Sequence, residues 1–521
     1  MSASTDKVVI GIDSSTQSTK ALAWDRSGRA VASGSAPIAM SNPCHDRFEQ
    51  DPVDWWRSFC GAVRECLRQI DGRAVEALSI AHQRETVAFL DHRGDAIRPA
   101  ILWLDERSRD NVASLGKSVG VDTVHRITGR YPDLTPTIYK LDWMRRHEPD
   151  VFARTTCFVD VQGYLGQRLV GGPFRTGWLS ADSFGLFDMV AREWSPLLLE
   201  ATGLSSDRLP LTVPPGTLLG NVTAAAAGDT GLPPGLPIFT GGGDGAYAGL
   251  GTDCTRTDRA YVNLGTAVVS GVWSPEYRYD RGWRTLLAAQ GEGYVFENVL
   301  RSGAFLVNWF VDNFVPQGRT DPRVFERLEA AAQEIPIGCH GLMIQPYWSG
   351  VMDPYWDVNA RGVTFGQSGS HKPAHFYRAI LEGITLDQVM RTRGTEAASG
   401  YPIDHYVANG GGSGSPLWRQ MLADASGKPV LISDTVEASA LGAGMTAAYG
   451  AGWFSSIAEA AHGMAGHTKP ILPDPRASER YGALLDIYQD AYGACSEINR
   501  RLVGFVREQG AAGRHDAGGA A

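Results

Sequence analysis

The chain lacks the composition signals of a secreted, membrane-spanning or nucleic-acid-binding protein. Its 521 residues contain seven scattered cysteines, with no CxxC pair, which excludes a disulfide framework and a cysteine zinc site. No apolar run approaches the ~20 residues that span a bilayer, and the opening residues MSASTDK contain no apolar signal-peptide core. There is no long basic stretch and the net charge is −9, so nucleic acid is not an expected partner. We expect a cytoplasmic protein.

Two common nucleotide-binding motifs are also missing. The segment LGKS at 115–118 looks like the end of a P-loop, but Asn111 stands where that motif requires glycine. No glycine cluster fits GxGxxG between a strand and a helix, which excludes a Rossmann dinucleotide site. The chain nevertheless has 61 glycines, so it must turn tightly at many places.

The most informative segment that is present is VVIGIDSSTQSTKALAW, residues 8–24. Its two apolar runs predict a hairpin of two strands, with Asp13 at the end of the first strand and a turn of small hydroxyl residues. Such a turn offers N–H and O–H groups to an anion, and a carboxylate beside it can hold Mg²⁺ directly or through water. Taken alone, the same pattern is also typical of an ordinary polar turn.

The second half of the chain repeats this pattern. AYVNLGTAVVSGVW, residues 260–273, again reads as strand, small polar turn and strand, with Gly265 and Thr266 in the turn. We therefore expect a duplicated α/β domain, with residues 1–255 in the first unit and 256–500 in the second. Helices are expected at 53–70, where Asp51 and Pro52 supply the start signals, and at 303–314, 374–393 and 416–426. Residues 501–521 are expected to end the last helix and to form a disordered tail beyond Gly510.

Two glycine-rich segments carry candidate site residues. In GGGDGAYAGLG, residues 241–251, Asp244 follows a strand and could act as a general base toward a hydroxyl, or it could simply cap a turn. The same segment lies near the domain junction and suits a hinge. In NGGGSGSPLW, residues 409–418, glycines before a helix could admit a flat adenine ring.

A further candidate is HQRET, residues 82–86, which lies between two expected strands. Arg84 and Glu85 form a donor–acceptor pair that could bind neighbouring hydroxyls of a substrate. Without other signals, an exposed loop with an ion pair explains these residues equally well.

Taken together and in their order, these segments resemble the FGGY family of carbohydrate kinases over about residues 8–490. The resemblance also includes EQDPVDWW, PAILWLDERS, HEPDVF, LEGI at 381–384 and ASALGAGMTAAYG. It implies an α/β fold of two actin-like (ribonuclease H-like) ATPase domains with a central cleft, with ATP and Mg²⁺ as cofactors and a small sugar or polyol as substrate.

The resemblance implies roles for particular residues. Asp244 matches the catalytic base, and Asp13 matches the acid near Mg²⁺ and the phosphates. The residues implied in substrate binding are Gln83, Arg84, Glu85, Trp103, Asp105, Asp244 and Gly245. Those implied in binding ATP and its phosphates are Asp13, Ser15, Thr16, Gln17, Thr19, Lys20, Gly265, Thr266, Gly303, Asn308, Gly411, Gly412 and Ser415.

The substrate subgroup is less sharply indicated. EQDPVDWW, HEPDVF and WRQMLAD look most like xylulokinases, whereas HQRET looks like glycerol kinase. We expect phosphorylation of a small ketose, a pentulose such as D-xylulose, with a glycerol or tetritol kinase as the alternative. A non-catalytic actin-like ATPase is the alternative of a different class, and such proteins lack HQRET and the Asp244 loop. A homodimer is possible for proteins of this kind.

Overall fold

The first three strands form an antiparallel meander, as the sequence predicts. In the computed structural model, which describes residues 7–517, β1 (Val8–Ser14) pairs with β2 (Ser18–Trp24), and β2 pairs with β3 (Ala30–Pro37). Helix α1 (Pro52–Leu67) covers one face of this meander and begins where Asp51 Oδ1 accepts a hydrogen bond from Val53 N at 2.9 Å.

Two six-stranded sheets repeat one topology. In each, a meander of three antiparallel strands is followed by two strands that continue the sheet in parallel: β6 and β15 beside β1, and β22 and β23 beside β16. This confirms the duplicated α/β fold. The first sheet has the order β14 (Leu218–Asn221), β15 (Pro237–Gly243), β6 (Val75–His82), β1, β2, β3, and the second β18 (Arg284–Leu287), β19 (Tyr294–Leu300), β17 (Val268–Ser274), β16 (Arg259–Leu264), β22 (His405–Asn409), β23 (Val430–Ile432).

A helix from late in the chain packs on the first sheet. Helix α15 (Ala438–Gly450) contacts β1, β6 and also α10 (Asp244–Gly251), so that Val9, Tyr247 and Leu441 share one hydrophobic core. A side chain at Gly11 of β1 would overlap the carbonyl of Ala440, so glycine is required for this close approach. The arrangement brings the start of α15 to the same place as Asp244.

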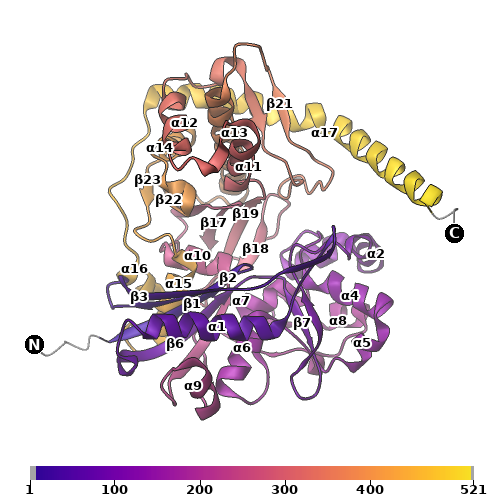
Figure 1. Ribbon diagram of the computed structural model, residues 1–521, viewed down its shortest axis with the longest axis vertical. Coiled ribbons are helices and arrows are strands. Elements are labelled where there is room, and N and C mark those ends of the chain that lie inside the picture. The colour runs from indigo at the N-terminus through magenta and orange to yellow at the C-terminus, as the bar shows by residue number, and fades with distance from the viewer. Residues whose placement is uncertain (1–6, 518–521) are drawn as a thin grey trace, which may run out of the picture.

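Residues 99–210 are mostly an addition to the first half, shown in purple at the lower right of Figure 1. A separate sheet joins them to the N-terminal region, in the order β4 (Ser41–Cys44), β5 (Arg47–Gln50), β8 (Ala96–Ile101), β7 (Val87–Leu90), β9 (Cys157–Val159). Its helices are α2 (Arg109–Val119), α3 (Val121–Thr128), α4 (Thr137–His147), α5 (Pro149–Arg154), α6 (Val161–Val170), α7 (Trp178–Ala181) and α8 (Pro196–Thr202), and the hairpin β11 (Phe187–Asp188) and β12 (Glu193–Trp194) lies among them. The short pair β10 (Arg175–Gly177) and β13 (Leu211–Val213) and helix α9 (Ala224–Thr230) complete the first half.

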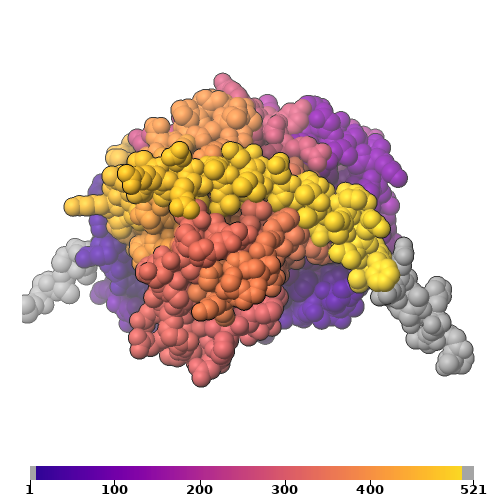
Figure 2. Space-filling view, turned by 90° about the horizontal axis from the view of Figure 1, so that it is seen from above, coloured from indigo at the N-terminus to yellow at the C-terminus, as the bar shows by residue number. Residues whose placement is uncertain are grey.

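The three helices expected in the second half are present as α11 (Ala304–Phe314), α13 (Pro373–Ser399) and α14 (Pro416–Ser426), although α13 continues beyond its expected end at residue 393. This half also contains α12 (Val324–Gln333), α16 (Ile457–Met464) and α17 (Pro475–Ala517), with a small hairpin of β20 (Met343–Gln345) and β21 (Val363–Phe365). Helix α17, in yellow, lies across the top of the second half and then extends beyond it (Figures 1 and 2).

The expected tail beyond Gly510 is helical as far as Ala517, because α17 continues through this alanine-containing segment. Residues 518–521 lie outside the described part of the chain. None of the helices in the described residues is both long and apolar enough to cross a membrane.

Candidate active site

The strand order brings the separate motifs to one edge of the first sheet. The neighbouring parallel strands β1, β6 and β15 all end there, with Asp13 paired to Ala81 and His82 paired to Gly243 in the register. Asp13, the HQRE segment and Asp244 therefore follow one another along this edge, the usual position of ligands in open α/β sheets.

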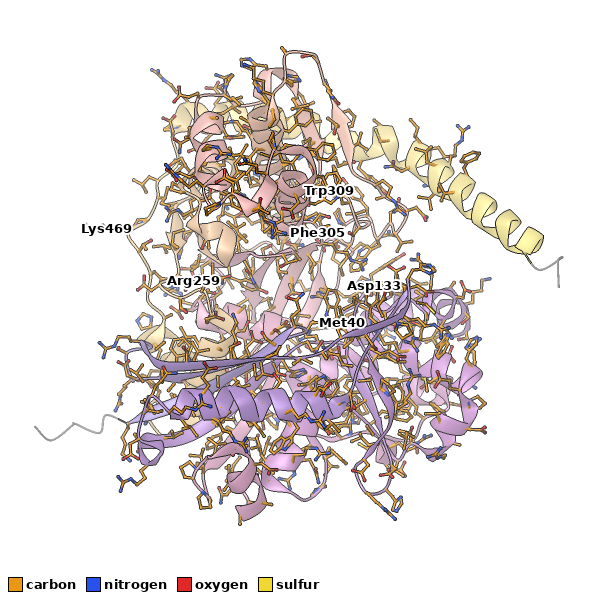
Figure 3. All side chains as sticks on the ribbon, in the orientation of Figure 1. Met40, Asp133, Arg259, Phe305, Trp309 and Lys469 are labelled. Atoms are coloured by element: carbon orange, nitrogen blue, oxygen red, sulfur yellow. The ribbon has the colours of Figure 1, made fainter. Side chains whose placement is uncertain are left out.

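The second sheet presents its own strand ends to the same place. A cleft of about 920 Å³ is lined from both halves, by Asp244 and Arg84 on one side and by Thr266 and Glu297 on the other. Phe305, labelled in Figure 3, lines the cleft from the second half. Ten of the expected site residues line the cleft: Ser15, Thr16, Gln83, Arg84, Glu85, Trp103, Asp105, Asp244, Gly245 and Thr266.

Arg84 and Glu85 are buried, not exposed as a loop ion pair would be. Their residual exposures are 3% and 5%. Arg84 pairs with Asp182 and donates to the carbonyl of Leu179 at 3.0 Å, while Glu85 accepts from Arg130 Nη1 at 2.6 Å. Glu85 also has a left-handed backbone, with φ +56°, a conformation that is strained for glutamate and is found most often at functional sites.

The charge network around Glu85 crosses the cleft. Arg284 of β18 lies 3.6 Å from the Glu85 carboxylate and pairs with Glu297 of β19, whose Oε1 also accepts from Tyr261 Oη at 3.1 Å. Burial opposes ionisation of Glu85, but Arg130, Arg284 and Arg84 outweigh it and hold the pKa of this carboxyl at about 2. The segment is therefore a fixed pair of charged groups at the floor of the cleft.

Sequence reasoning missed the partners that fix this pair. They are Arg130, Asp182, Arg284 and Glu297, all on segments remote from HQRET. Glu297 did leave a signal, because it is a charged residue inside the apolar strand YVFENVL and is fully buried. The others have no local pattern that distinguishes them.

Asp244 is the first residue of α10 and lines the cleft. Its Oδ1 accepts from Gly245 N at 2.9 Å, and its carbonyl accepts from Ser439 Oγ at 3.1 Å. Burial raises the pKa of Asp244 to about 6, with Glu85 and Glu297 adding to the effect against Arg84. A carboxylate with this pKa is ionised at neutral pH and basic enough to take a proton from a hydroxyl.

Asp13 lies at the end of β1 with an unused carboxylate oxygen. Within the described residues Oδ1 is buried and has no hydrogen-bond partner. Burial raises the pKa of Asp13 to about 7, and the charges of Asp244 and Glu437 act in the same direction. An unpartnered carboxylate oxygen at this place fits a bound cation, which would supply the missing partner.

The structure does not support every expected phosphate-binding residue. The role of Thr19 as a phosphate ligand stays a prediction, because its hydroxyl is buried, lies 3.3 Å from Ser14 Oγ and does not line the cleft. Lys20 lies on the face of Asp13, but its ammonium group is bound to Glu437 Oε1 at 2.6 Å. The side chain of Gln17 is exposed and does not line the cleft.

Among the residues of the second half that were expected to bind the nucleotide, some also have structural roles and most do not line the cleft. Gly303 N donates to the carbonyl of Thr266 at 3.0 Å, so Gly303 supports the second hairpin turn. Ser415 caps α14, where its Oγ accepts from Trp418 N at 3.1 Å. Of the seven expected nucleotide positions in the second half, Thr266 lines the cleft and six do not: Gly265, Gly303, Asn308, Gly411, Gly412 and Ser415.

Three further expected substrate positions, Trp103, Asp105 and Gln83, line the cleft with polar groups already engaged. Trp103 Nε1 donates to Thr16 Oγ1 at 2.9 Å, which ties the first hairpin turn to the next sheet. Both oxygens of Asp105 are bonded to Arg107, and Oδ2 also accepts from Phe48 N at 2.7 Å. Gln83 donates to Gln50 Oε1 at 2.9 Å.

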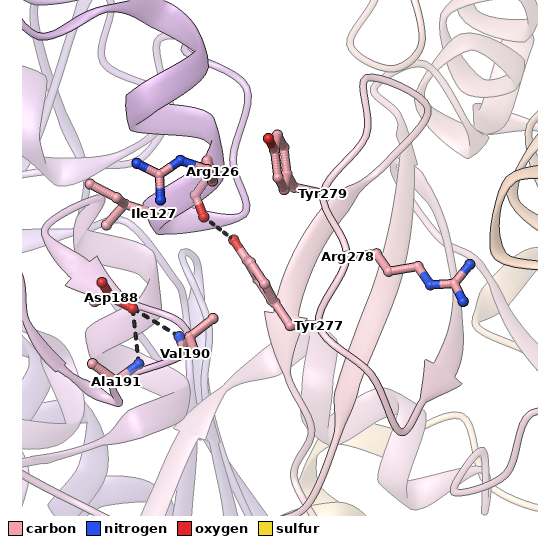
Figure 4. Close-up of a pocket in the computed structure, with 8 residues that line it drawn as sticks. All are labelled: Arg126, Ile127, Asp188, Val190, Ala191, Tyr277, Arg278 and Tyr279. Carbon is pink, nitrogen blue, oxygen red and sulfur yellow. Dashed lines mark hydrogen bonds between the residues drawn. The ribbon is translucent and has the colours of Figure 1, made fainter.

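A second cavity lies outside the cleft, between α3, the β11–β12 hairpin and residues 277–279 (Figure 4). Tyr277 Oη donates there to the carbonyl of Arg126 at 2.8 Å, which links the two halves of the chain. None of the expected site residues lines it. Among the described residues there is also no group of three His, Cys, Asp or Glu side chains that could hold a metal.

Comparison with known proteins identifies relatives along most of the chain. Models of the N-terminal and C-terminal domains of the FGGY family of carbohydrate kinases match residues 8–251 and 260–451. A xylulose kinase of Bacillus subtilis is 27% identical over 96% of this chain and 99% of its own length. A gluconokinase of the same species is 24% identical over 95% of this chain and 99% of its own length. The crystal structure of a xylulose kinase from Rhodospirillum rubrum superposes with a TM-score of 0.87 at 27% identity, covering 95% of this chain and all of that chain.

Proposed function

Because the chain belongs to the FGGY family of carbohydrate kinases, we propose that it transfers the terminal phosphoryl group of ATP to a hydroxyl of a pentulose such as D-xylulose. The observation that carries this proposal is the cleft itself. It joins one free carboxylate, Asp244, to the fixed Arg84–Glu85 pair and to the hydroxyl-rich turn at Ser15 and Thr16.

In this proposal the floor of the cleft recognises the sugar. Arg84 and Glu85 offer a donor and an acceptor whose positions are set by Asp182, Arg130 and Arg284. Fixed polar groups of this kind favour a substrate whose hydroxyls match them, since an analogue without the hydroxyl leaves them unpaired. Trp103 provides an apolar wall above them.

Asp244 takes the proton of the attacking hydroxyl, and the two hairpin turns hold the phosphates. Backbone N–H groups at Thr16 and Thr266, which line the cleft from the two turns, are suited to phosphate oxygens. Mg²⁺, when bound, neutralises charge on the phosphates, and Asp13 Oδ1 would hold it directly or through water. One carboxylate is sufficient, because Mg²⁺ is commonly held by one or two carboxylates together with substrate phosphates.

The experiment that tests the function is ATP turnover against a panel of sugars. The panel contains D-xylulose and other pentuloses, gluconate, hexuloses, tetritols and glycerol. The proposal expects the highest kcat/KM with a pentulose. Best turnover of glycerol or a tetritol would instead favour the alternative suggested by HQRET, and no turnover of any acceptor would favour a non-catalytic ATPase.

We also propose that the protein works in the cytoplasm as a homodimer, with domains divided near residue 255. Support for self-association comes from α17, where the apolar side chains of Ile498, Leu502 and Phe505 are each more than half exposed. Sedimentation of the full chain and of Leu502→Glu tests this, since the substitution should shift the equilibrium toward monomer.

A further inference from the structure

Among the described residues, two guanidinium groups that line the cleft, those of Arg301 and Arg361, have no carboxylate partner, and only Arg361 is held by short hydrogen bonds to carbonyl groups. Arg84 pairs with Asp182, Arg284 with Glu297 and Arg109 with Glu106. Arg301 also lines the cleft, but within the described residues no carboxylate oxygen lies within 4.0 Å of it. Its one hydrogen bond there is a long one, from Nη1 to the carbonyl of Ser349 at 3.5 Å. A half-buried guanidinium group without a partner is costly unless a ligand supplies one.

Arg301 is placed beside the second hairpin turn by the sheet register. Leu300, the last residue of β19, pairs with Val268, the first residue of β17 after the turn. Arg301 follows Leu300 directly, and two residues later the chain is bonded to the turn itself. Gly303 N and Phe305 N donate to the Thr266 carbonyl at 3.0 and 3.2 Å. Arg301 and Thr266 are therefore held as one unit.

The surroundings leave this positive charge available. Burial lowers the pKa of Arg301, and Arg284 and Arg109 act in the same direction, while Asp133 and Glu106 of the opposite half partly offset them. A guanidinium group nevertheless stays protonated in proteins. The cleft thus contains a charged fork of N–H donors next to the turn at Thr266 and facing the half that holds Asp244.

We propose that Arg301 is a catalytic residue that binds the phosphoryl group while it passes from ATP to the sugar. This role rests on the proposed function. In the step, the sugar oxygen forms a bond to the γ-phosphorus and its proton passes to Asp244. The bond from the γ-phosphorus to the bridging oxygen breaks, and its electron pair stays on ADP. Charge spreads over the outer phosphoryl oxygens during this transfer, and a bidentate guanidinium group stabilises it.

The test compares Arg301→Gln and Arg301→Lys with Arg361→Gln. Arg361 is a matched control, because it borders the same cleft but its Nη1 is held by the carbonyls of Val358 and Ala360 at 3.0 and 2.8 Å. With a neutral sugar as acceptor, we expect Arg301→Gln to lower kcat about 10²–10⁴-fold, at or somewhat below the effect of arginine groups in other phosphoryl-transfer enzymes. The KM values for sugar and ATP should change little, and Arg301→Lys should recover only part of the loss, since lysine cannot bind two oxygens as a fork.

A binding measurement gives a readout that does not depend on turnover. Aluminium fluoride, bound with ADP and Mg²⁺, mimics the transferring phosphoryl group. Calorimetry should show that it makes ADP bind more tightly to the wild type and to Arg361→Gln. It should not make ADP bind more tightly to Arg301→Gln. If the wild type turns over no sugar, the proposed function fails, but this comparison still decides the role of Arg301.

Two results would overturn the proposal. The first is an unchanged kcat and unchanged aluminium fluoride binding in a folded Arg301→Gln protein. The second is a rise in KM confined to acidic sugars such as gluconate, with normal kcat on neutral sugars, which would assign Arg301 to a carboxylate of the substrate.

Discussion

At the scale of single residues, carboxylates that line the cleft or lie beside it are held in opposite electrostatic states. Glu85 is surrounded by guanidinium groups that keep it ionised, whereas burial raises the pKa values of Asp13 and Asp244 to about 7 and about 6. Environments that push the pKa values of neighbouring acids apart are typical of sites where one group binds and another takes a proton. The first prediction follows from the pKa of Asp244.

The sugar kinase reaction should lose activity as the pH falls through about 6. Asp244 can accept a proton only when it is ionised, and with a pKa of about 6 it becomes protonated below that pH. We expect kcat/KM to decline about tenfold per pH unit on the acid side, measured at saturating Mg²⁺ so that Asp13 stays ionised. A flat profile down to pH 4.5 would argue against Asp244 as the base.

Asp13→Asn should make the protein without Mg²⁺ and nucleotide more stable. The pKa of Asp13 is raised in the folded state, so its ionisation costs stability progressively as the pH rises from about 4, its ordinary pKa, through about 7. Removing the charge should stabilise the fold by about 1–2 kcal/mol at pH 8 and by less at pH 5. Thermal unfolding at both pH values measures this.

The same variant should lose the stabilisation that Mg²⁺ and ATP give to the wild type, because the carboxylate that would hold the ion is gone. A melting temperature that is unchanged at pH 8, or a normal response to Mg²⁺ with ATP, would contradict the assignment of Asp13.

Sequence analysis identified several charged residues of the site, but not the partners that hold Arg84 and Glu85 in place. Asp13, Arg84 and Asp244 were found because each stands at the end of an apolar run, where a polar side chain is conspicuous. Arg130 and Asp182 were not found, since their partners are more than 40 residues away and only the fold brings them together. The hydroxyl pattern of the turn does not reveal that Thr19 is buried, because its burial depends on the side-chain alternation of the strand that it begins to enter.

At the scale of elements, glycines fix the distance between the strand ends and the charged floor. A Cβ atom at Gly243 would lie 2.6 Å from Arg84 Cγ and 2.7 Å from Cδ, and one at Gly245 would collide with Glu297 Oε1.

The boundaries of helices such as α1 could be predicted well from the sequence, because capping residues and apolar periodicity are local features. α1 was expected at 53–70 and is found at Pro52–Leu67.

Gly243→Ala should therefore displace Arg84 and weaken sugar binding. We expect KM for the sugar to rise at least about 10-fold, because a shift of roughly 1 Å in a positioning group has effects of this size, with KM for ATP nearly unchanged. Gly228→Ala is the matched control, since Gly228 lies in α9 with no atom near its missing Cβ. Equal sugar KM values in the two variants would show that Arg84 does not depend on this contact.

At the scale of the whole molecule, the glycine-rich segment 241–251, which its composition suggests as a hinge, is closely packed in this structure. It forms the end of β15 and helix α10, and a side chain at Gly241 would overlap the carbonyl of Ile80, so its glycines serve close packing. The two halves are instead joined near the cleft floor, where Thr285 N donates to Gly129 O at 2.8 Å and Leu287 N to Asp182 Oδ2 at 3.0 Å. Which segments pivot could not be predicted from composition, because packing decides it.

We expect the two halves to close on the nucleotide. The phosphate-binding turns lie on different halves, at Ser15–Thr16 and at Thr266, and both must reach the same nucleotide. Sugar together with a non-hydrolysable ATP analogue should therefore reduce the radius of gyration in solution scattering. Identical scattering with and without saturating ligands would count against closure.

The proposed mechanism depends most directly on Asp244 as the general base, and one measurement tests this role. With the best acceptor from the sugar panel, Asp244→Asn should lower kcat about 10²–10⁴-fold, the usual effect of losing a general base. Binding of ATP, measured by calorimetry, should stay nearly normal, because the substitution keeps the size of the side chain and its acceptor for Gly245 N. A folded Asp244→Asn protein with near-normal kcat would remove Asp244 from the mechanism and contradict the proposed site.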